Sequence, residues 1–357
     1  MNKKIIFTAG GTGGHLLQAI NLMKHFSEKG NNVILVTDKR GNKYIKNFLD
    51  YKSYVFKAGT PTNKNIFKKF LSFFVILGSL IKSVLILFKE KPDLVIGFGG
   101  YVSFPISFVS KLFNSPLIIY ENNLVFGRAN KFLLKFAKKI LTAKPIKKDF
   151  PEKYRNKIYI VGSILDKNII NYSSNKKNMD DGLSILILGG SQGAEIFGTV
   201  VPTAIKMVKE KGFLIEVNQQ CIKSQKNIII NYYKKNDIKN YVFEFENNIL
   251  ELISSANLAI TRCGASATAE LAHTATPFIG VPLKNSIDNH QFLNAKFYEE
   301  MSCCWILEEK NFNEKNLFNL IMEIVNNKNK LKNIRSNIKK KYNNVYANIE
   351  SQIKEFI

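Results

Sequence analysis

The stretch Ile5–His15 reads Ile-Ile-Phe-Thr-Ala-Gly-Gly-Thr-Gly-Gly-His, an apolar run that breaks into a glycine-rich turn. Residues 183–194 repeat this pattern as Leu-Ser-Ile-Leu-Ile-Leu-Gly-Gly-Ser-Gln-Gly-Ala. In both places a run of strand length leads through a turn with a hydroxyl residue into a segment of helical pattern. Such turns suit anionic ligands, because glycine exposes backbone N–H groups and the following helix adds partial positive charge. Two of them predict an α/β protein with two Rossmann-like, doubly wound domains facing one cleft.

Length and composition agree with two domains. The chain has 357 residues and 45% hydrophobic content, enough for two well-cored domains. We place an N-terminal domain at 1–161 and a C-terminal domain at 162–338, with the boundary near Gly162 and a polar loop soon after it. Residues 339–357 are expected to form a terminal helix that packs back on the N-terminal domain.

The charge balance indicates an anionic partner without identifying it. The formal net charge is +24, from 52 basic and 28 acidic residues. A nucleic acid, a phospholipid surface or a phosphorylated substrate would each explain it, and a chain-wide bias toward lysine and asparagine explains part of it equally well. With only five arginines and no recognition motif, nucleic acid is not an expected partner.

The cysteines and the chain start favour a cytoplasmic protein. Cys221, Cys263, Cys303 and Cys304 have no Cys-x-x-Cys spacing and no histidines clustered around them, so we expect reduced thiols and no metal site. The opening Met-Asn-Lys-Lys runs directly into the first predicted strand, which leaves no room for a signal peptide.

Residues 65–88 form a lysine-flanked apolar segment. Its longest uncharged run, 70–81, has 12 residues, too few for a bilayer span of roughly 20 helical residues. One interpretation is a core helix of the α/β layer. The other is a patch of exposed Phe and Leu, ringed by Lys68, Lys69 and Lys82, that rests on an anionic membrane surface. Both interpretations hold if one face of the helix packs in the core and the other face contacts the membrane.

Six motifs occur in the order and spacing of one known family. They are the turns at 10–15, 97–101 and 189–194, the Glu-Asn-Asn run at 121–123, Arg262–Ala265 with Glu270, and Gln291 with Asn294 and Ala295. Through nearly its whole length the chain resembles the MurG family of peptidoglycan glycosyltransferases. The resemblance implies a GT-B fold of two Rossmann-like domains, with the acceptor on the N-terminal half and the nucleotide sugar on the C-terminal half.

The resemblance also implies the reaction. Such enzymes transfer N-acetylglucosamine, with inversion and without metal or other cofactor, from UDP-N-acetylglucosamine to the muramyl C4 hydroxyl of undecaprenyl-pyrophosphoryl-MurNAc-pentapeptide, turning lipid I into lipid II. They act as peripheral proteins on the cytoplasmic face of the inner membrane, and other cell-wall synthesis enzymes are implied partners. Two alternatives remain: another GT-B lipid or metabolite transferase, and a non-catalytic UDP-sugar-binding protein.

The residues themselves fit a transferase that works without metal. The sequence has no Asp-x-Asp motif, so backbone N–H groups and a helix N-terminus must stabilise the leaving diphosphate. The turns at 189–193 and 264–266 supply candidates. The attacking hydroxyl needs a base, and His15 is well suited, unless it only caps or orients its loop. Glu121 is the rival base, unless it is a structural acid at a strand end.

The resemblance assigns the substrate contacts. It places four residues of the N-terminal half against the donor sugar, Ser191 beside the diphosphate, Glu270 on the ribose hydroxyls and Gln291 on the sugar. Arg262 is either a phosphate ligand or part of a structural ion pair. The expected binding set is Thr12, Gly13, Gly14, Asn123, Ser191, Gln192, Gly193, Arg262, Ala265, Ser266, Thr268, Glu270 and Gln291.

Four positions depart from the family pattern. Gln18 stands where proline is frequent, and Tyr120 replaces a histidine before the Glu-x-Asn run. Asp166 ends a linker that usually carries arginine, and His290 replaces the first glutamine of Asp-x-Gln-Gln. An acid after the second strand, Asp38, is where a Rossmann dehydrogenase holds ribose, but Leu16 stands where the third glycine of that motif belongs.

Overall fold

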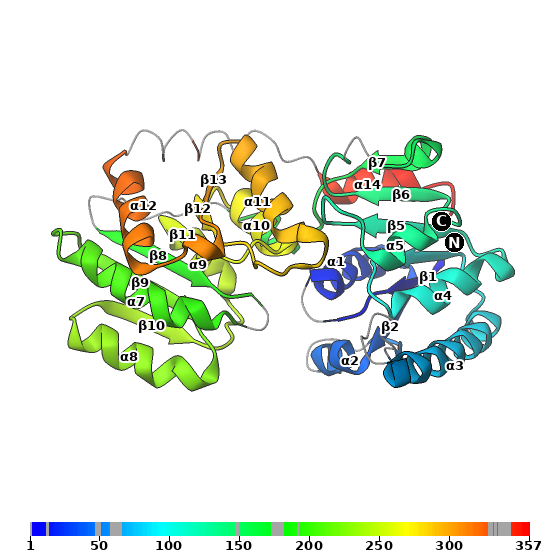
Figure 1. Cartoon of the computed structure of the whole chain (residues 1–357). Helices are drawn as coiled ribbons and strands as arrows, with labels where there is room; N and C mark the ends of the chain where they lie inside the picture. The colour runs from blue at the N-terminus through cyan, green and yellow to red at the C-terminus, as the bar shows by residue number, and fades with distance from the viewer. Residues whose placement is uncertain are drawn as a thin grey trace. The chain divides into compact units, whose positions relative to one another are not determined.

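Two units make up the computed structural model, which describes residues 2–11, 14–46, 51–57, 66–146, 150–172, 182–190, 193–327, 331, 334 and 344–357, with backbone alone at 43–46, 66–71 and 287. Unit 1 comprises Met1–Asp166 and Asn343–Ile357, and unit 2 comprises Lys167–Tyr342 (Figure 1). The sequence predicts these divisions at 161/162 and 338/339, a few residues earlier than the structure has them. The last segment of the chain thus belongs to the same unit as its beginning.

Unit 1 is built on a seven-stranded parallel sheet in the order β3-β2-β1-β4-β5-β6-β7. The strand bounds are β1 Lys4–Thr8, β2 Asn32–Asp38, β3 Ser53–Phe56, β4 Leu94–Gly97, β5 Leu117–Glu121, β6 Lys139–Thr142 and β7 Ile158–Ile160. The order reverses between β1 and β4, and at such a switch point the carboxyl ends of the strands open toward a ligand. Both glycine turns of this unit, after β1 and after β4, lie there.

Helices cover this sheet. Their bounds are α1 Gly14–Glu28, α2 Lys39–Lys46, α3 Ile66–Glu90, α4 Ser103–Val109, α5 Arg128–Leu133 and α14 Val345–Ile353, with 3-10 turns η1 Ser110–Phe113 and η2 Glu152–Lys157. The central strands are buried along nearly their whole length, which is why they read as continuous apolar runs. On one face, Val95 and Ile119 pack with Ile86 and Leu87 of α3 and with Ile106 of α4.

The terminal helix α14 is held against unit 1 by side-chain hydrogen bonds. Asn344 caps it by accepting from the Ala347 N–H at 3.2 Å. The Tyr346 hydroxyl donates to the Leu165 carbonyl at 2.6 Å, and Asn348 donates to the Val161 carbonyl at 3.3 Å. The chain between β7 and the unit boundary is therefore fixed from the side of α14.

Unit 2 repeats the architecture with a six-stranded parallel sheet in the order β10-β9-β8-β11-β12-β13. The strands are β8 Leu183–Leu188, β9 Ile215–Gln220, β10 Lys239–Phe243, β11 Leu258–Thr261, β12 Phe278–Gly280 and β13 Cys304–Ile306. The helices are α6 Lys167–Ile170, α7 Glu195–Lys209, α8 Lys226–Lys235, α9 Ile249–Ser255, α10 Ala265–His273, α11 His290–Glu300 and α12 Glu314–Asn326, with 3-10 turns η4 Lys223–Gln225, η5 Ile287–Asn289 and η6 Glu309–Asn311.

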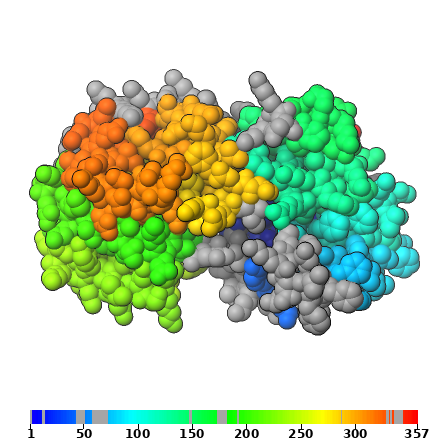
Figure 2. Space-filling view, in the orientation of Figure 1, coloured from blue at the N-terminus to red at the C-terminus, as the bar shows by residue number. Residues whose placement is uncertain are grey.

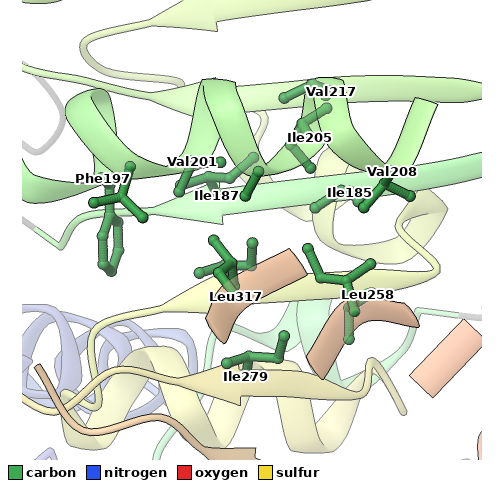
Figure 3. Close-up of a cluster of buried hydrophobic side chains, with 14 of the residues drawn as sticks. Ile185, Ile187, Phe197, Val201, Ile205, Val208, Val217, Leu258, Ile279 and Leu317 are labelled. Carbon is green, nitrogen blue, oxygen red and sulfur yellow. The ribbon is translucent and has the colours of Figure 1, made fainter. Parts of the chain in front are cut away.

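One hydrophobic core of unit 2 lies between its sheet and the helices α7, α8 and α12, and a second includes residues of α9, α10 and α11. Figure 3 shows Val201 and Ile205 of α7 over Ile187 of β8, with Leu317 of α12 in the same cluster. Figure 2 shows the outer surfaces of α12, in orange, and α8, in yellow-green, on this unit. The two parallel sheets confirm the predicted α/β class with two doubly wound domains.

Candidate active site

The first glycine turn is braced by Asp38. Its carboxylate accepts hydrogen bonds from the Gly11 N–H at 3.2 Å, from the Gly41 N–H at 2.8 Å and from the Arg40 guanidinium at 3.0 Å. Asp38 therefore joins the turn after β1 to the start of α2. Its role here is structural, whereas the corresponding acid of a Rossmann dehydrogenase binds ribose. Thr12 and Gly13 lie outside the described residues.

His15 stands in the first turn of α1 and is half-buried. Beside it is Gly99, whose φ of +95° is one that side-chain-bearing residues rarely adopt. A Cβ at Gly99 would lie 3.5 Å from His15 Cε1 and 3.2 Å from Asn130 Nδ2. The expected base and a buried asparagine thus border the space that a side chain at Gly99 would fill. Gly14, which precedes His15, is exposed at the start of α1.

Glu121, at the end of β5, is fully buried and surrounded by donors. One carboxylate oxygen accepts from the backbone and side-chain N–H groups of Asn123, both at 3.1 Å. The other accepts from the Gly127 N–H and from Asn130 Nδ2, both at 3.0 Å. Four donors use the acceptor sites of a carboxylate. This arrangement favours a structural acid that shapes the loop 122–130 over a base.

Tyr120, which replaces the histidine of the family pattern, has a structural role. Its hydroxyl donates to the Gly162 carbonyl at 3.0 Å and accepts from the Ile164 N–H at 3.0 Å. Burial raises the pKa of this phenol far above its ordinary value, so the group stays protonated and able to donate. The tyrosine therefore ties the end of β5 to the chain that leaves β7.

The main glycine turn of unit 2 follows β8. The Gly189 N–H donates to Gln220 Oε1 at 3.1 Å, and Gly190 and Gly193 have φ of +81° and +72°. A Cβ at Gly193 would come within 2.6 Å of Ile222 Cγ2, so only glycine fits there. Ser191 and Gln192 lie outside the described residues.

A second turn of unit 2 joins β11 to α10. Gly264 precedes the helix, and Ala265 and Ser266 are its first two residues, so the positive end of the helix dipole lies at this turn. Thr268 is buried, and its hydroxyl donates to the Gly264 carbonyl at 3.0 Å, so this side chain is used inside α10. Glu270 is half-buried one turn further on.

Gln291 of α11 reaches back to this second turn. Its Oε1 accepts from the Leu283 N–H at 3.0 Å and from the Cys263 N–H at 3.3 Å. Since both partners are donors, the orientation of the amide is fixed and its NH₂ group faces away from them. Asn294 also binds this turn, because its side-chain amide donates to the Cys263 carbonyl at 3.2 Å.

Arg262 is held in an ion pair. Its guanidinium lies 2.9 Å from Glu309 Oε2, donates to the Val281 carbonyl at 3.2 Å and lies over the Phe197 ring. Burial alone would raise the pKa of Glu309, but hydrogen bonds from the Lys284 N–H and from Arg262 outweigh it and lower that pKa. This favours the structural interpretation of Arg262 over a phosphate contact.

The described candidates thus form two groups, each at the carboxyl ends of its own sheet. Unit 1 carries Gly14, His15, Glu121 and Asn123, and unit 2 carries Gly193, Arg262, Ala265, Ser266, Thr268, Glu270 and Gln291. Sequence reasoning missed Asn130, a buried residue of α5, since nothing in its neighbourhood distinguishes it from a surface asparagine.

Two parallel doubly wound sheets, each with glycine turns at its strand ends, define the class of GT-B glycosyltransferases. The chain belongs to glycosyltransferase family 28: residues 5–142 match the N-terminal domain of that family and residues 184–349 match its C-terminal domain.

Individual relatives match the chain over nearly its full length. A UDP-N-acetylglucosamine–N-acetylmuramyl-(pentapeptide) pyrophosphoryl-undecaprenol N-acetylglucosamine transferase of Pelagibacter ubique is 36% identical, covering 99% of this chain and 100% of the relative. A protein of the same name from Rickettsia canadensis is 34% identical over the same shares. The crystal structure of Acinetobacter baumannii MurG matches with a TM-score of 0.80, 25% identity and 99% coverage of both chains. The resemblance to the MurG family is confirmed.

Proposed function

We propose that this protein transfers N-acetylglucosamine from UDP-N-acetylglucosamine to the muramyl C4 hydroxyl of undecaprenyl-pyrophosphoryl-MurNAc-pentapeptide, which converts lipid I to lipid II in peptidoglycan synthesis. The observation that carries the proposal is the match over 99% of the chain to a relative named for this transfer. The site chemistry supports it, because each unit presents glycine turns at its strand ends where anionic or sugar ligands bind in this class of fold.

In the proposed mechanism the acceptor hydroxyl oxygen forms a bond to the anomeric carbon while the bond to the UDP oxygen breaks. His15 takes the hydroxyl proton, a role that suits an imidazole near neutral pH. The departing diphosphate gains negative charge, which the partial positive charge at the N-terminus of α10 stabilises. The NH₂ group of Gln291 is left to donate to the sugar or the diphosphate, because its carbonyl oxygen is already used.

A direct test compares acceptors. The protein is given labelled UDP-N-acetylglucosamine with either a short-chain lipid-linked muramyl-pentapeptide or a diacylglycerol. Transfer to the muramyl acceptor alone supports the proposal. Transfer to diacylglycerol would indicate another GT-B lipid transferase, and UDP binding without transfer to either acceptor would indicate a non-catalytic sugar-nucleotide-binding protein.

We propose further that α3 attaches the protein to an anionic membrane surface, the cytoplasmic face of the inner membrane, as a peripheral protein. One face of this helix exposes a stripe of large apolar side chains spaced by three, four and seven residues: Phe73, Phe74, Leu77, Ile81, Val84, Leu85 and Phe88. Phe88 is 70% exposed and Leu85 is 64% exposed. A contiguous apolar stripe of this kind is typical of a helix that lies in a lipid interface.

The opposite face of α3 is anchored in unit 1. Glu90 is buried and pairs with Lys52 at 2.6 Å and Lys4 at 3.4 Å, while Ile86 and Leu87 join the core. The 19-residue stretch Ser72–Glu90 is long and apolar enough to cross a membrane by length and composition alone, a test that core helices also pass. Packing of one face and exposure of the other support lateral attachment. Lys82 donates to the Val55 carbonyl at 2.7 Å, so it is tied to β3.

A further inference from the structure

One side chain of unit 2 bridges the ends of three neighbouring strands. Gln220 is the last residue of β9, which lies between β8 and β10 in the sheet. Its Oε1 accepts from the N–H of Gly189, the residue after β8, at 3.1 Å, and its Nε2 donates to the carbonyl of Glu244, the residue after β10, at 3.2 Å. Because one partner is a donor and the other an acceptor, the orientation of the amide is fixed. The proposed transfer assigns no role to this residue.

The contact with Gly189 holds a turn whose two ends touch. The Gly193 N–H donates to the Gly190 carbonyl at 3.0 Å. A Cβ at Gly189 would lie 2.9 Å from Gly193 Cα, which is closer than packed atoms approach. A displacement of Gly189 would therefore also move Gly193 and the entry into α7.

A second glutamine holds the first turn of α7 from the same segment of chain. Gln225, the last residue of η4, donates through Nε2 to the Glu195 carbonyl at 3.0 Å. Its amide lies against Gly198 of α7, where a Cβ would come within 2.8 Å of Nε2. Ile222 lies between the two glutamines in sequence and occupies the space beside Gly193. The chain after β9 thus supports the glycine turn and the start of α7 at several points.

We infer that Gln220 and Gln225 are positioning residues for the nucleotide-sugar donor, because they hold the turn 189–193 and the start of α7 in the conformation that receives it. This inference rests on the proposed function, with the turn beside the diphosphate of UDP-N-acetylglucosamine as the family resemblance implies. The Gly189 N–H is used by Gln220, so Gln220 acts on the donor through the turn. A turn that is already held in its binding conformation loses less freedom when the ligand binds, which strengthens binding.

The first test compares two side-chain amides that make the same pair of hydrogen bonds. In unit 1, Asn31 Oδ1 accepts from the Lys3 N–H at 3.3 Å and Nδ2 donates to the Phe26 carbonyl at 3.1 Å, at the amino-end edge of the sheet. Gln220→Leu and Asn31→Leu should therefore lose similar stability in urea unfolding. Only Gln220→Leu should bind UDP more weakly in calorimetry, by about tenfold. Native-like UDP binding by Gln220→Leu, or equal weakening in Asn31→Leu, would overturn the inference.

Steady-state rates give a second readout on the same variant. In Gln220→Leu the KM for UDP-N-acetylglucosamine should rise by about tenfold, because the donor must order the turn as it binds. The KM for a short-chain lipid-linked muramyl-pentapeptide should stay unchanged. An equal rise in both KM values would indicate a general loosening of the protein and would contradict a role in positioning the donor.

A further variant displaces Gln225 while keeping every hydrogen-bonding residue. Gly198→Ala places a methyl group where the Gln225 amide lies, and alanine favours a helix more than glycine does. This variant should bind UDP more weakly without losing stability, beside Thr199→Ala as an exposed control on the next residue of α7. Undiminished UDP binding by Gly198→Ala would overturn the role of Gln225.

Binding of UDP to the native protein separates the two levels of the account. If the native protein binds no UDP, the proposed function fails and the positioning role fails with it. If the native protein binds UDP and both Gln220→Leu and Gly198→Ala bind it equally well, only the positioning role fails.

Discussion

The side-chain amide of Asn130 donates to Glu121 Oε2 at 3.0 Å, and this bond fixes which way the amide points. A carboxylate only accepts, so Nδ2 must face Glu121 and Oδ1 must face away. Among the described residues Asn130 Oδ1 has no hydrogen-bond partner, although the side chain is buried. A side chain at Gly99 would stand next to both Asn130 Nδ2 and His15 Cε1, so Asn130 lies between Glu121 and the neighbourhood of His15. We therefore expect Glu121 to influence the site through the loop that its hydrogen bonds hold.

Replacing Glu121 by glutamine should disturb this loop and not the proton transfer itself. Glu121→Gln keeps the shape but places an NH₂ group against N–H donors, which should cost about 1–3 kcal/mol of unfolding free energy. We expect a lower transfer rate with an unchanged pH profile, measured beside Glu300→Gln, an exposed control in unit 2. A shifted pH optimum without loss of stability would make Glu121 the base instead.

A methyl group at Gly99 should be costly because the backbone conformation disfavours a side chain and Asn130 lies close to it. Gly99→Ala forces a side chain onto φ +95° and places Cβ 3.2 Å from Asn130 Nδ2. We expect a loss of about 1–3 kcal/mol of stability, together with reduced transfer, by urea unfolding and activity assay. Gly78→Ala in α3 is the matched control: a Cβ there meets nothing within 4 Å, and the change should raise stability slightly. Equal effects would contradict the packing around Gly99.

The stability of unit 1 should fall in acid through Glu90. Burial opposes ionisation of this carboxyl, but hydrogen bonds from Lys52, Tyr54 and Lys4 outweigh it and lower its pKa from 4.5 to about 2. A depressed pKa contributes stability that is present above pH 4.5 and is lost as the pH falls toward 2. The contribution of Glu90 to the free energy of unfolding should be about 1–2 kcal/mol. This is less than the whole pKa shift would correspond to, because solvent screens the half-exposed Lys52.

The predicted contribution of Glu90 can be measured by urea unfolding of the native protein and of Glu90→Gln at several pH values. The variant should be less stable at pH 6 and should approach the native protein near pH 2. A constant difference between the two across that range would mean that Glu90 does not titrate in this way.

The exposed face of α3 should dominate binding to lipid. Leu85→Ser with Phe88→Ser removes two large side chains from the surface, and vesicle binding should fall by about a hundredfold if both enter the interface. Transfer to a short-chain acceptor in solution should remain. Ile228→Ser, at an exposed apolar position of α8, is the control. Loss of vesicle binding in the control but not in the double variant would place the lipid contact on unit 2.

The sheets were predictable because of how parallel strands are buried. Runs such as 94–97 and 183–188 are almost wholly apolar and end at or directly before a glycine, so strand and turn both follow from the residues. The alternation of these runs with helical segments fixes the fold class. The two faces of α3 were also foreseeable, since lysines flank a segment whose apolar residues outnumber what one face needs.

The roles of individual polar residues were not predictable, because they depend on partners brought together by folding. The sequence leaves Glu121 open as either the rival base or a structural acid, and the donors that favour the structural role reach it only in the folded loop 122–130. Arg262 finds its carboxylate at Glu309, far along the chain. The spacing of residues along the sequence does not predict these contacts.

The most direct test is the rate of transfer of labelled N-acetylglucosamine to a short-chain lipid-linked muramyl-pentapeptide by the native protein and by His15→Gln, with UDP binding measured on both. If His15 is the base, the variant should bind UDP normally and lose about 10²- to 10⁴-fold in rate. A variant that keeps its rate to within a few-fold of the native protein would contradict the proposed mechanism.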